Sequence, residues 1–119
     1  MDNKCASIFF EALSSPIRLD IFRLLVRNAP DGLVAGDIAE TLKIQPTNLS
    51  FHLKALTQSG LLEVEREGRY MRYRAKIPLM LDIIAYLTAE CCAEHPEKCL
   101  AFREASAVPR GALPELWLD

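Results

Sequence analysis

Residues 36–56 read GDIAETLKIQPTNLSFHLKAL, and this stretch decides the fold. Its first part has the apolar spacing of a short helix over residues 34–43, and Pro46 follows closely. Proline disfavours helix at the residue before it, so a turn is expected there. A second helix is expected over residues 47–59, ended by Gly60. Its apolar face recurs at intervals of four and three residues and consists of Leu49, Leu53 and Leu56.

Small polar side chains occupy the rest of the second helix. A short helix, a tight turn and a polar second helix form the arrangement that enters the major groove of DNA. Amide side chains pair bidentately with adenine, while hydroxyls and lysine reach base edges or phosphates. We therefore predict DNA contact, with Lys54 directed at phosphate and His52 either reading bases or bracing the helix. The predicted readout face consists of Gln45, Thr47, Asn48, Ser50 and His52.

Further elements are expected on both sides of this motif. Ser14 or Ser15 followed by Pro16 is typical of a helix start. The alternating pattern on either side of Gly68 and Arg69 is typical of a β-hairpin. Pro96 is expected to end the last helix. The expected helices span residues 4–13, 16–28 and 78–94, and the expected strands span residues 61–67 and 70–76.

The order of these elements predicts the fold class, which is mainly α with a small β-hairpin (α+β). Four helices, a hairpin and a last helix, in the order ααααββα, indicate a winged helix-turn-helix. With 119 residues the chain has room for one such domain. We place this DNA-binding and dimerisation domain over residues 1–102 and a C-terminal tail over residues 103–119.

Charge is unevenly distributed along the chain. The net charge is −2, but residues 43–76 carry seven basic and three acidic side chains, which leaves −6 for the remainder. A local basic face on an acidic body is typical of nucleic-acid binding. The expected hairpin would form a wing that contacts the DNA backbone or an adjacent minor groove. Its arginines are Arg66, Arg69, Arg72 and Arg74.

The bulk composition argues against two classes of protein. No apolar run approaches the ~20 residues that span a bilayer, and the N-terminal segment lacks the apolar core of a secretory signal. A cytoplasmic protein without membrane contact is therefore expected. Thiols stay reduced in that compartment, so clustered cysteines favour metal or redox chemistry over structural disulfides.

Three of the four cysteines lie close together near the expected end of the last helix: Cys91, Cys92 and Cys99. Neighbouring side chains on a helix diverge by about 100°, yet both sulfurs can approach one small ion at a helix end. The chain must fold back after Pro96 to bring the third thiol in. Three thiolates make a soft site of low coordination number. Trivalent arsenic or antimony suits it, because each carries a lone pair and binds three sulfurs in a trigonal pyramid.

Other interpretations of the thiols stay open. Zinc prefers four tetrahedral ligands, and His95 could complete a Cys₃His set. A redox disulfide is a third option, although one between the neighbours Cys91 and Cys92 would be strained. Inert cysteines that pack as small apolar residues are a fourth option, and the best interpretation of Cys5. A thiol enzyme is disfavoured, because no partner base or CxxC spacing is evident.

The sequence resembles the ArsR/SmtB family of metalloregulatory repressors over about residues 8–100. The resemblance is carried by ALSSPIRLDIFRLL at 12–25, by the helix-turn-helix at 36–56 and by GLLEVEREGRYMRYRA at 60–75. It implies a homodimer built through the first and last helices that binds palindromic double-stranded operator DNA until an inducer releases it. In one branch of the family the inducer is arsenite or antimonite, bound at a vicinal cysteine pair and one further cysteine. That pattern maps onto Cys91, Cys92 and Cys99.

Two departures from the family narrow the expectation. Arsenic repressors with cysteines on the first helix of the helix-turn-helix differ from this chain, which has Val34, Ala35 and Gly36 there. The family's zinc site needs aspartate and histidine in the last helix, and this helix offers Asp82 but no histidine before His95. The expected function is therefore a metalloid-responsive repressor, not an enzyme, with As(III) or Sb(III) as inducer and no organic cofactor.

Overall fold

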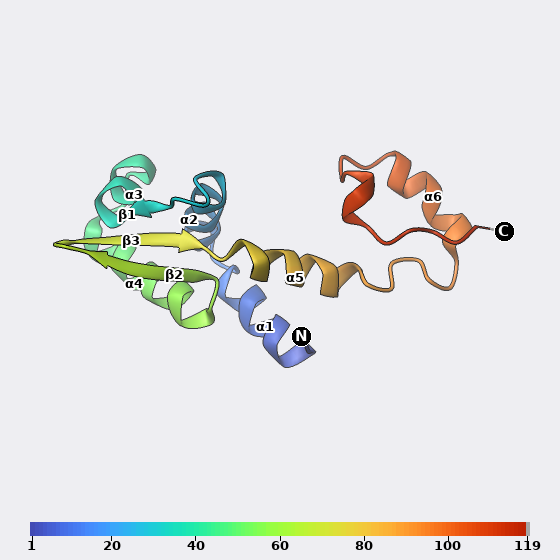
Figure 1. Cartoon of the computed structure of the whole chain (residues 1–119), viewed down its shortest axis with the longest axis horizontal. Helices are drawn as coiled ribbons and strands as arrows, with labels where there is room; N and C mark the ends of the chain where they lie inside the picture. Colours follow the sequence, from blue (N-terminus) through green and yellow to red (C-terminus); the bar gives the residue numbers. More distant parts are fainter. Residues whose placement is uncertain (119) are drawn as a thin grey trace. The chain divides into compact units, whose positions relative to one another are not determined.

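A computed structural model describes residues 1–118 of the chain, as two compact units divided after Met80. The helices and strands are labelled in Figure 1. In the first unit they are α1 (Asn3–Ala12), α2 (Pro16–Arg27), β1 (Leu33–Val34), α3 (Ala35–Leu42), α4 (Pro46–Ser59), β2 (Leu62–Glu67) and β3 (Tyr70–Ala75). Helix α5 (Ile77–Thr88) crosses the division, and α6 (Pro96–Glu104) and a 3₁₀ turn (Arg110–Ala112) follow it.

The first unit confirms the winged helix-turn-helix. Strands β2 and β3 pair antiparallel in a register that sets Leu62 opposite Ala75 and Glu67 opposite Tyr70. Strand β1 adds to the other edge of β3, so the sheet order is β1-β3-β2. This two-residue strand was not predicted, because it is too short to show an alternating pattern. The largest side chains that are almost completely buried in this unit are Ile21, Leu25, Ile38, Leu49, Leu53, Leu56, Leu61 and Leu62.

Local signals in the sequence explain where these elements begin and end. The Ser15 hydroxyl accepts a hydrogen bond from the backbone N–H of Arg18 and caps α2, with Pro16 at the first helical position. Gly60 ends α4 in the left-handed conformation, as expected. Gly32 is also left-handed, and a Cβ on it would overlap the Tyr73 carbonyl oxygen, so this turn before β1 requires glycine.

The second unit corrects the expected last helix. Helix α5 ends at Thr88, not near residue 94, because the apolar spacing stops there and no buried face remains to hold another turn. Pro96 begins α6, where proline fits the first helical position. Cys91 and Cys92 therefore lie in turns between two helices, and Cys99 lies on the second of them. The proposed boundary at residue 102 stays a prediction. Within residues 1–118, no helix has both the length and the apolar character needed to cross a bilayer.

Candidate functional site

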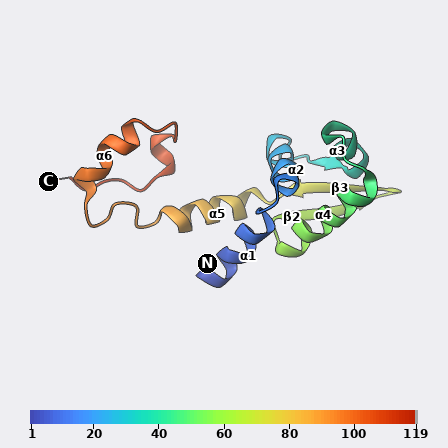
Figure 2. The same cartoon turned by 180° about the vertical axis from the view of Figure 1, so that it is seen from behind.

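Helix α4 separates a buried face from an exposed polar face, as the sequence predicts. Its three leucines are at most 2% exposed. Lys43 adopts the left-handed conformation, and the Ile44 amide bonds to the Ala39 carbonyl at 3.0 Å, which closes the turn between α3 and α4. The exposed residues of α4 and its N-cap that the sequence predicted for DNA contact are Gln45, Thr47, Asn48, Ser50 and Lys54. The two helices and the strands they accompany are seen from behind in Figure 2.

His52 differs from the other predicted readout residues, because the protein itself engages its side chain. The ring is half-buried, and its Nδ1 accepts a hydrogen bond from Nε of Arg18 on α2 at 3.2 Å. Burial, and secondarily the Arg18 charge, lowers the pKa of His52 from its usual value, which favours the neutral ring that this bond needs. This hydrogen bond links α4 to α2, and it fits the bracing role that the sequence left open beside base contact.

Two residues near this face were missed by sequence reasoning. Phe51 directly follows Ser50 and is 64% exposed, an unusual place for a phenyl ring. Its position four residues after Thr47 was the available signal, since it puts an apolar group on the polar side of α4. Arg18 lies 5.9 Å from the centre of that ring. No local pattern could have identified Arg18, because its partners lie 33 and 34 residues along the chain.

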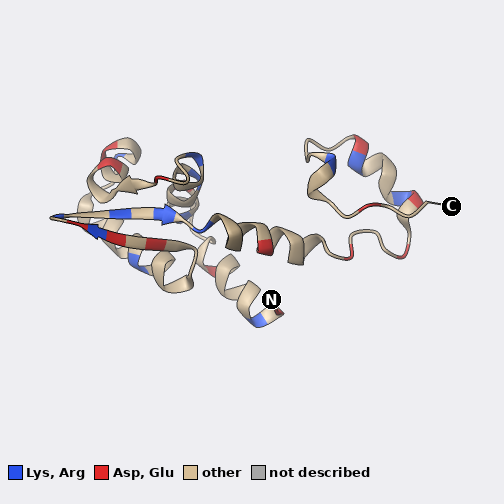
Figure 3. Cartoon of the chain, viewed as in Figure 1, with Lys and Arg blue, Asp and Glu red and all other residues tan. Residues whose placement is uncertain are grey.

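The wing arginines fall into two groups. Arg72 donates to Glu67 at 2.8 Å and Arg74 donates to Glu65 at 2.6 Å, so carboxylates of the wing neutralise both. The Glu67 hydrogen bond raises the pKa of Arg72. Arg66 and Arg69 are exposed near the Gly68 turn, and Arg66 Nε donates to the Gly68 carbonyl. Basic and acidic segments accordingly lie side by side along β2 and β3 in Figure 3.

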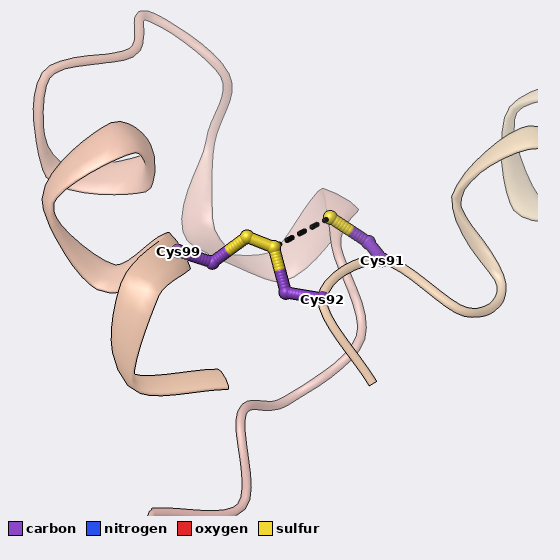
Figure 4. A group of neighbouring side chains, drawn as sticks. All are labelled: Cys91, Cys92 and Cys99. Atoms are coloured by element: carbon purple, nitrogen blue, oxygen red, sulfur yellow. Dashed lines mark hydrogen bonds between the residues drawn. A yellow bond between two sulfur atoms is a disulfide. The ribbon is translucent and has the colours of Figure 1, made fainter. Parts of the chain in front are cut away.

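The three clustered cysteines are brought together, as predicted. The sulfurs of Cys91, Cys92 and Cys99 all lie within 4.8 Å of one another, and each residue is half-buried. Cys92 and Cys99 are joined as a disulfide with their Cα atoms 5.9 Å apart, and Cys91 Sγ lies 4.0 Å from Cys92 Sγ. Figure 4 shows the vicinal pair facing the α6 cysteine across the turn. Cys5 is exposed on α1.

This arrangement supports two kinds of chemistry. When all three thiols are reduced, their sulfurs are close enough to converge on one soft ion, at metal–sulfur bonds of about 2.3 Å as found for zinc. When Cys92 and Cys99 are oxidised, two of the three donors are lost. His95 does not join the group among the described residues, because its side chain is 62% exposed with Nδ1 3.9 Å from a Glu97 oxygen. The donor set therefore has three sulfurs, which fits a trigonal ion better than tetrahedral zinc.

The C-terminal segment covers one side of the thiol cluster. Arg103 on α6 donates to the Cys91 carbonyl at 3.3 Å and to the Pro114 carbonyl. A hollow beside Cys91 and Cys92 is lined mainly by apolar residues, which come from the segment around these cysteines and from residues 114–117. These lining residues include Pro96, Pro114, Leu116 and Trp117. Residues 114–117 thus lie beside Cys91 and Cys92.

The comparisons with known proteins agree with this geometry. Residues 13–65 match the family model described as a helix-turn-helix domain. A probable mercury resistance operon repressor of Streptomyces lividans is 28% identical over 85 residues, which cover 71% of this chain and 64% of that protein. An uncharacterised HTH-type transcriptional regulator of Methanocaldococcus jannaschii is 37% identical over 68 residues, covering 57% of this chain and 74% of the relative.

Two solved structures are similar over most of the chain. An ArsR-like transcriptional regulator from Rhodococcus sp. RHA1 is 28% identical with a TM-score of 0.64, covering 88% of this chain and 96% of that one. The homodimeric winged helix-turn-helix DNA-binding domain of a possible ArsR-family regulator from Mycobacterium bovis is 26% identical with a TM-score of 0.58, covering 74% and 82%. These relatives confirm a regulator rather than an enzyme. The chain belongs to the ArsR/SmtB-type family of helix-turn-helix transcriptional regulators.

Proposed function

We propose that this chain is a metalloid-responsive repressor, which binds operator DNA as a homodimer and leaves it when As(III) or Sb(III) binds Cys91, Cys92 and Cys99. One observation carries the proposal: three sulfurs from a nine-residue segment lie within 4.8 Å of one another in a helix-turn-helix regulator. Such a soft donor group is not needed for packing. A cytoplasmic location follows from the operator as target.

The DNA contacts that we propose come from α4 and the wing. The exposed amides and hydroxyls of α4 would read base edges, while exposed basic residues would hold phosphates. His52 and Arg72 remain in the predicted set, although each already has a partner inside the protein. The set is Gln45, Thr47, Asn48, Ser50, His52, Lys54, Arg66, Arg69 and Arg72.

Dimer formation is supported by two observations. The M. bovis domain of similar fold is homodimeric. In this chain, α1 and α5 carry exposed large apolar side chains that a partner subunit would cover. They are Ile8 and Phe10 on α1 and Leu81, Ile84 and Leu87 on α5.

The choice of inducer rests on the donor set. Thiolates bind thiophilic ions, and three of them suit a trigonal pyramid around As(III) or Sb(III) better than tetrahedral zinc. The S. lividans relative is a probable mercury resistance operon repressor, so control of resistance to a thiophilic metal has a parallel in a similar protein. Release would require the inducer to favour the low-affinity dimer by a coupling energy, typically ~1–3 kcal/mol. Closing the three thiolates on one ion would tie α6 to the turn after α5 and so supply that energy.

A second candidate function is thiol redox sensing. The disulfide between Cys92 and Cys99 favours it, because oxidation of this pair would change the same turn that the inducer changes. Both candidate functions would act by linking α6 to the turn that follows α5. They differ in the role of Cys91, which an inducer would need and the disulfide would not.

Operator release measured by fluorescence anisotropy tests both candidates. Reduced wild-type protein should leave the labelled operator on addition of arsenite or antimonite but not zinc. The variants Cys91→Ser, Cys92→Ser and Cys99→Ser should bind the operator normally and stay bound, whereas the control Cys5→Ser should respond like wild type. Release by hydrogen peroxide with Cys91→Ser unaffected would instead support the redox function. Normal arsenite release of Cys92→Ser would refute the site.

A further inference from the structure

The first turn of α2 presents a cation to the exposed side of α4. Arg18 is half-buried and uses Nε to donate to His52 Nδ1 at 3.2 Å. Its guanidinium carbon lies 5.9 Å from the centre of the Phe51 ring, within the range of a cation–π interaction. The Phe51 and His52 rings meet edge to face, with centroids 5.4 Å apart and planes at 74°. Two adjacent side chains of α4 therefore hold one side of Arg18.

On its other side, Arg18 has no hydrogen-bond or ion-pair partner among the described residues 1–118. A guanidinium has five N–H donors, of which His52 takes one. No carboxylate among residues 1–118 lies within ion-pair distance of Arg18, in contrast to Arg72 and Arg74 of the wing. A half-buried cation without a counter-ion needs another source of acceptors. The remaining donors form a fork of the kind that binds phosphate bidentately.

We propose that Arg18 binds a phosphate of the DNA backbone, with His52 and Phe51 as positioning residues that hold its guanidinium beside the readout face. The proposal rests on the DNA-binding function proposed above. In a helix-turn-helix, the reading helix enters the major groove, and contacts to the phosphates beside it fix its register. Arg18 is held by Phe51 and His52 of the reading helix, and these residues directly follow the readout residue Ser50. A phosphate contact by Arg18 would therefore fix the position of the readout residues on the DNA directly.

A purely structural role for these three residues makes different predictions. If these residues only linked α2 to α4, they would stabilise the fold but would not change the number of ions released when DNA binds. A phosphate contact releases counterions, and each contact contributes about −0.9 to the slope of log K against log salt concentration. The salt slope therefore separates the two roles, while the melting temperature of each variant reports any loss of stability.

The test uses a fluorescein-labelled duplex recovered from random-sequence DNA by in vitro selection with the wild-type protein. Affinity is measured by anisotropy over a series of salt concentrations. Arg18→Ala should weaken binding at least about tenfold and lower the salt slope by about 0.9 for each protomer bound. Arg23→Ala is the matched control: it removes the same charge from an exposed position on the same helix and should leave the slope unchanged.

The positioning role of His52 has its own pair of variants. His52→Asn keeps an acceptor close to the position of Nδ1 and should retain most of the affinity. His52→Leu removes the acceptor and should weaken binding several-fold while the salt slope stays near that of wild type. Equal weakening by both variants would refute the positioning role of His52.

Three outcomes decide between the proposals. A wild-type protein that selects no duplex refutes the DNA-binding function itself. Tight wild-type binding with an unchanged slope in Arg18→Ala refutes the phosphate contact alone. A lower melting temperature for Arg18→Ala, together with an unchanged slope, assigns Arg18 to the structural role.

Discussion

The unit that ends at Met80 and the unit that follows it differ in the interactions that stabilise each of them internally. The first unit buries eight large side chains almost completely, drawn from α2, α3, α4 and the start of the wing. After Met80, Ile83 is the buried residue among those described, and Leu87, Phe102 and Trp117 are all more than two-thirds exposed. The second unit relies instead on the thiol cluster and on Arg103, which joins Cys91 to Pro114 through their carbonyls.

This difference fits the two tasks of the proposed repressor, which are to read DNA and to respond to an inducer. A reading surface needs fixed geometry, and a close-packed core supplies it. A sensing segment must change shape on binding a ligand, and segments with few buried contacts open at low free-energy cost. The winged unit thus suits DNA recognition, while the thiol unit suits a change of conformation that a few sulfur–ligand bonds can drive.

The largest effect is expected from shortening apolar side chains in the two units. Leu53→Ala in α4 should lower the free energy of unfolding by about 2–5 kcal/mol, because it leaves a cavity in the closed core. Leu100→Ala in α6 should cost less than about 1 kcal/mol, because that side chain is already partly in water. Urea unfolding of the reduced proteins, followed by far-ultraviolet circular dichroism, measures both. Similar losses for the two variants would contradict the difference between the units.

The two units also differ in how tightly the backbone is constrained at their glycines. Gly32→Ala should destabilise the protein by about 1–3 kcal/mol or more, because its left-handed conformation and the nearby Tyr73 carbonyl leave no room for a Cβ. Gly111→Ala should be close to neutral, since nothing lies within 4 Å of the added atom. Thermal melting would show the difference, and a neutral Gly32→Ala would mean that the turn before β1 is as adaptable as the tail.

The reading surface can be altered without touching the thiols. Asn48→Ala should weaken binding to the selected operator by about 1–3 kcal/mol, the value of one good bidentate base contact. Arsenite affinity of the same variant should not change. Gln58→Ala, at an exposed position near the other end of α4, is the control and should bind as wild type. Unchanged operator affinity in Asn48→Ala would refute the assignment of α4 as the reading helix.

The smallest effect is expected in the wing. Arg69→Ala should lower the salt slope of operator binding by about one for each wing that contacts phosphate. Arg74→Ala should change the slope less, because Glu65 and Glu67 already neutralise this side chain. A larger change for Arg74 than for Arg69 would show that DNA displaces the glutamates and that the division of the wing arginines does not persist in the complex.

Much of the winged unit could be predicted from local sequence. The leucine spacing in α4, the Ser15 cap, Pro16, Pro46 and Gly60 act within one helical turn of their own position, so a one-dimensional pattern reveals them. The predicted last helix, over residues 78–94, is too long, because neither helical spacing nor Pro96 marks the residue at which the buried face of the helix ends. Thr88 ends α5 earlier, and the same proline begins α6.

By itself, the sequence determined the helix-turn-helix, the hairpin and the list of candidate thiols, since each depends on residue type and short spacing. Only the tertiary structure decided that Arg18 meets His52 and Phe51, that Arg72 and Arg74 face glutamates, and that Cys99 returns to the vicinal pair. The physical reason is that side-chain partners are chosen by packing and electrostatics in three dimensions. The sequence predicts that the chain folds back near Pro96, but the spacing of Cys92 and Cys99 does not set how close their sulfurs come.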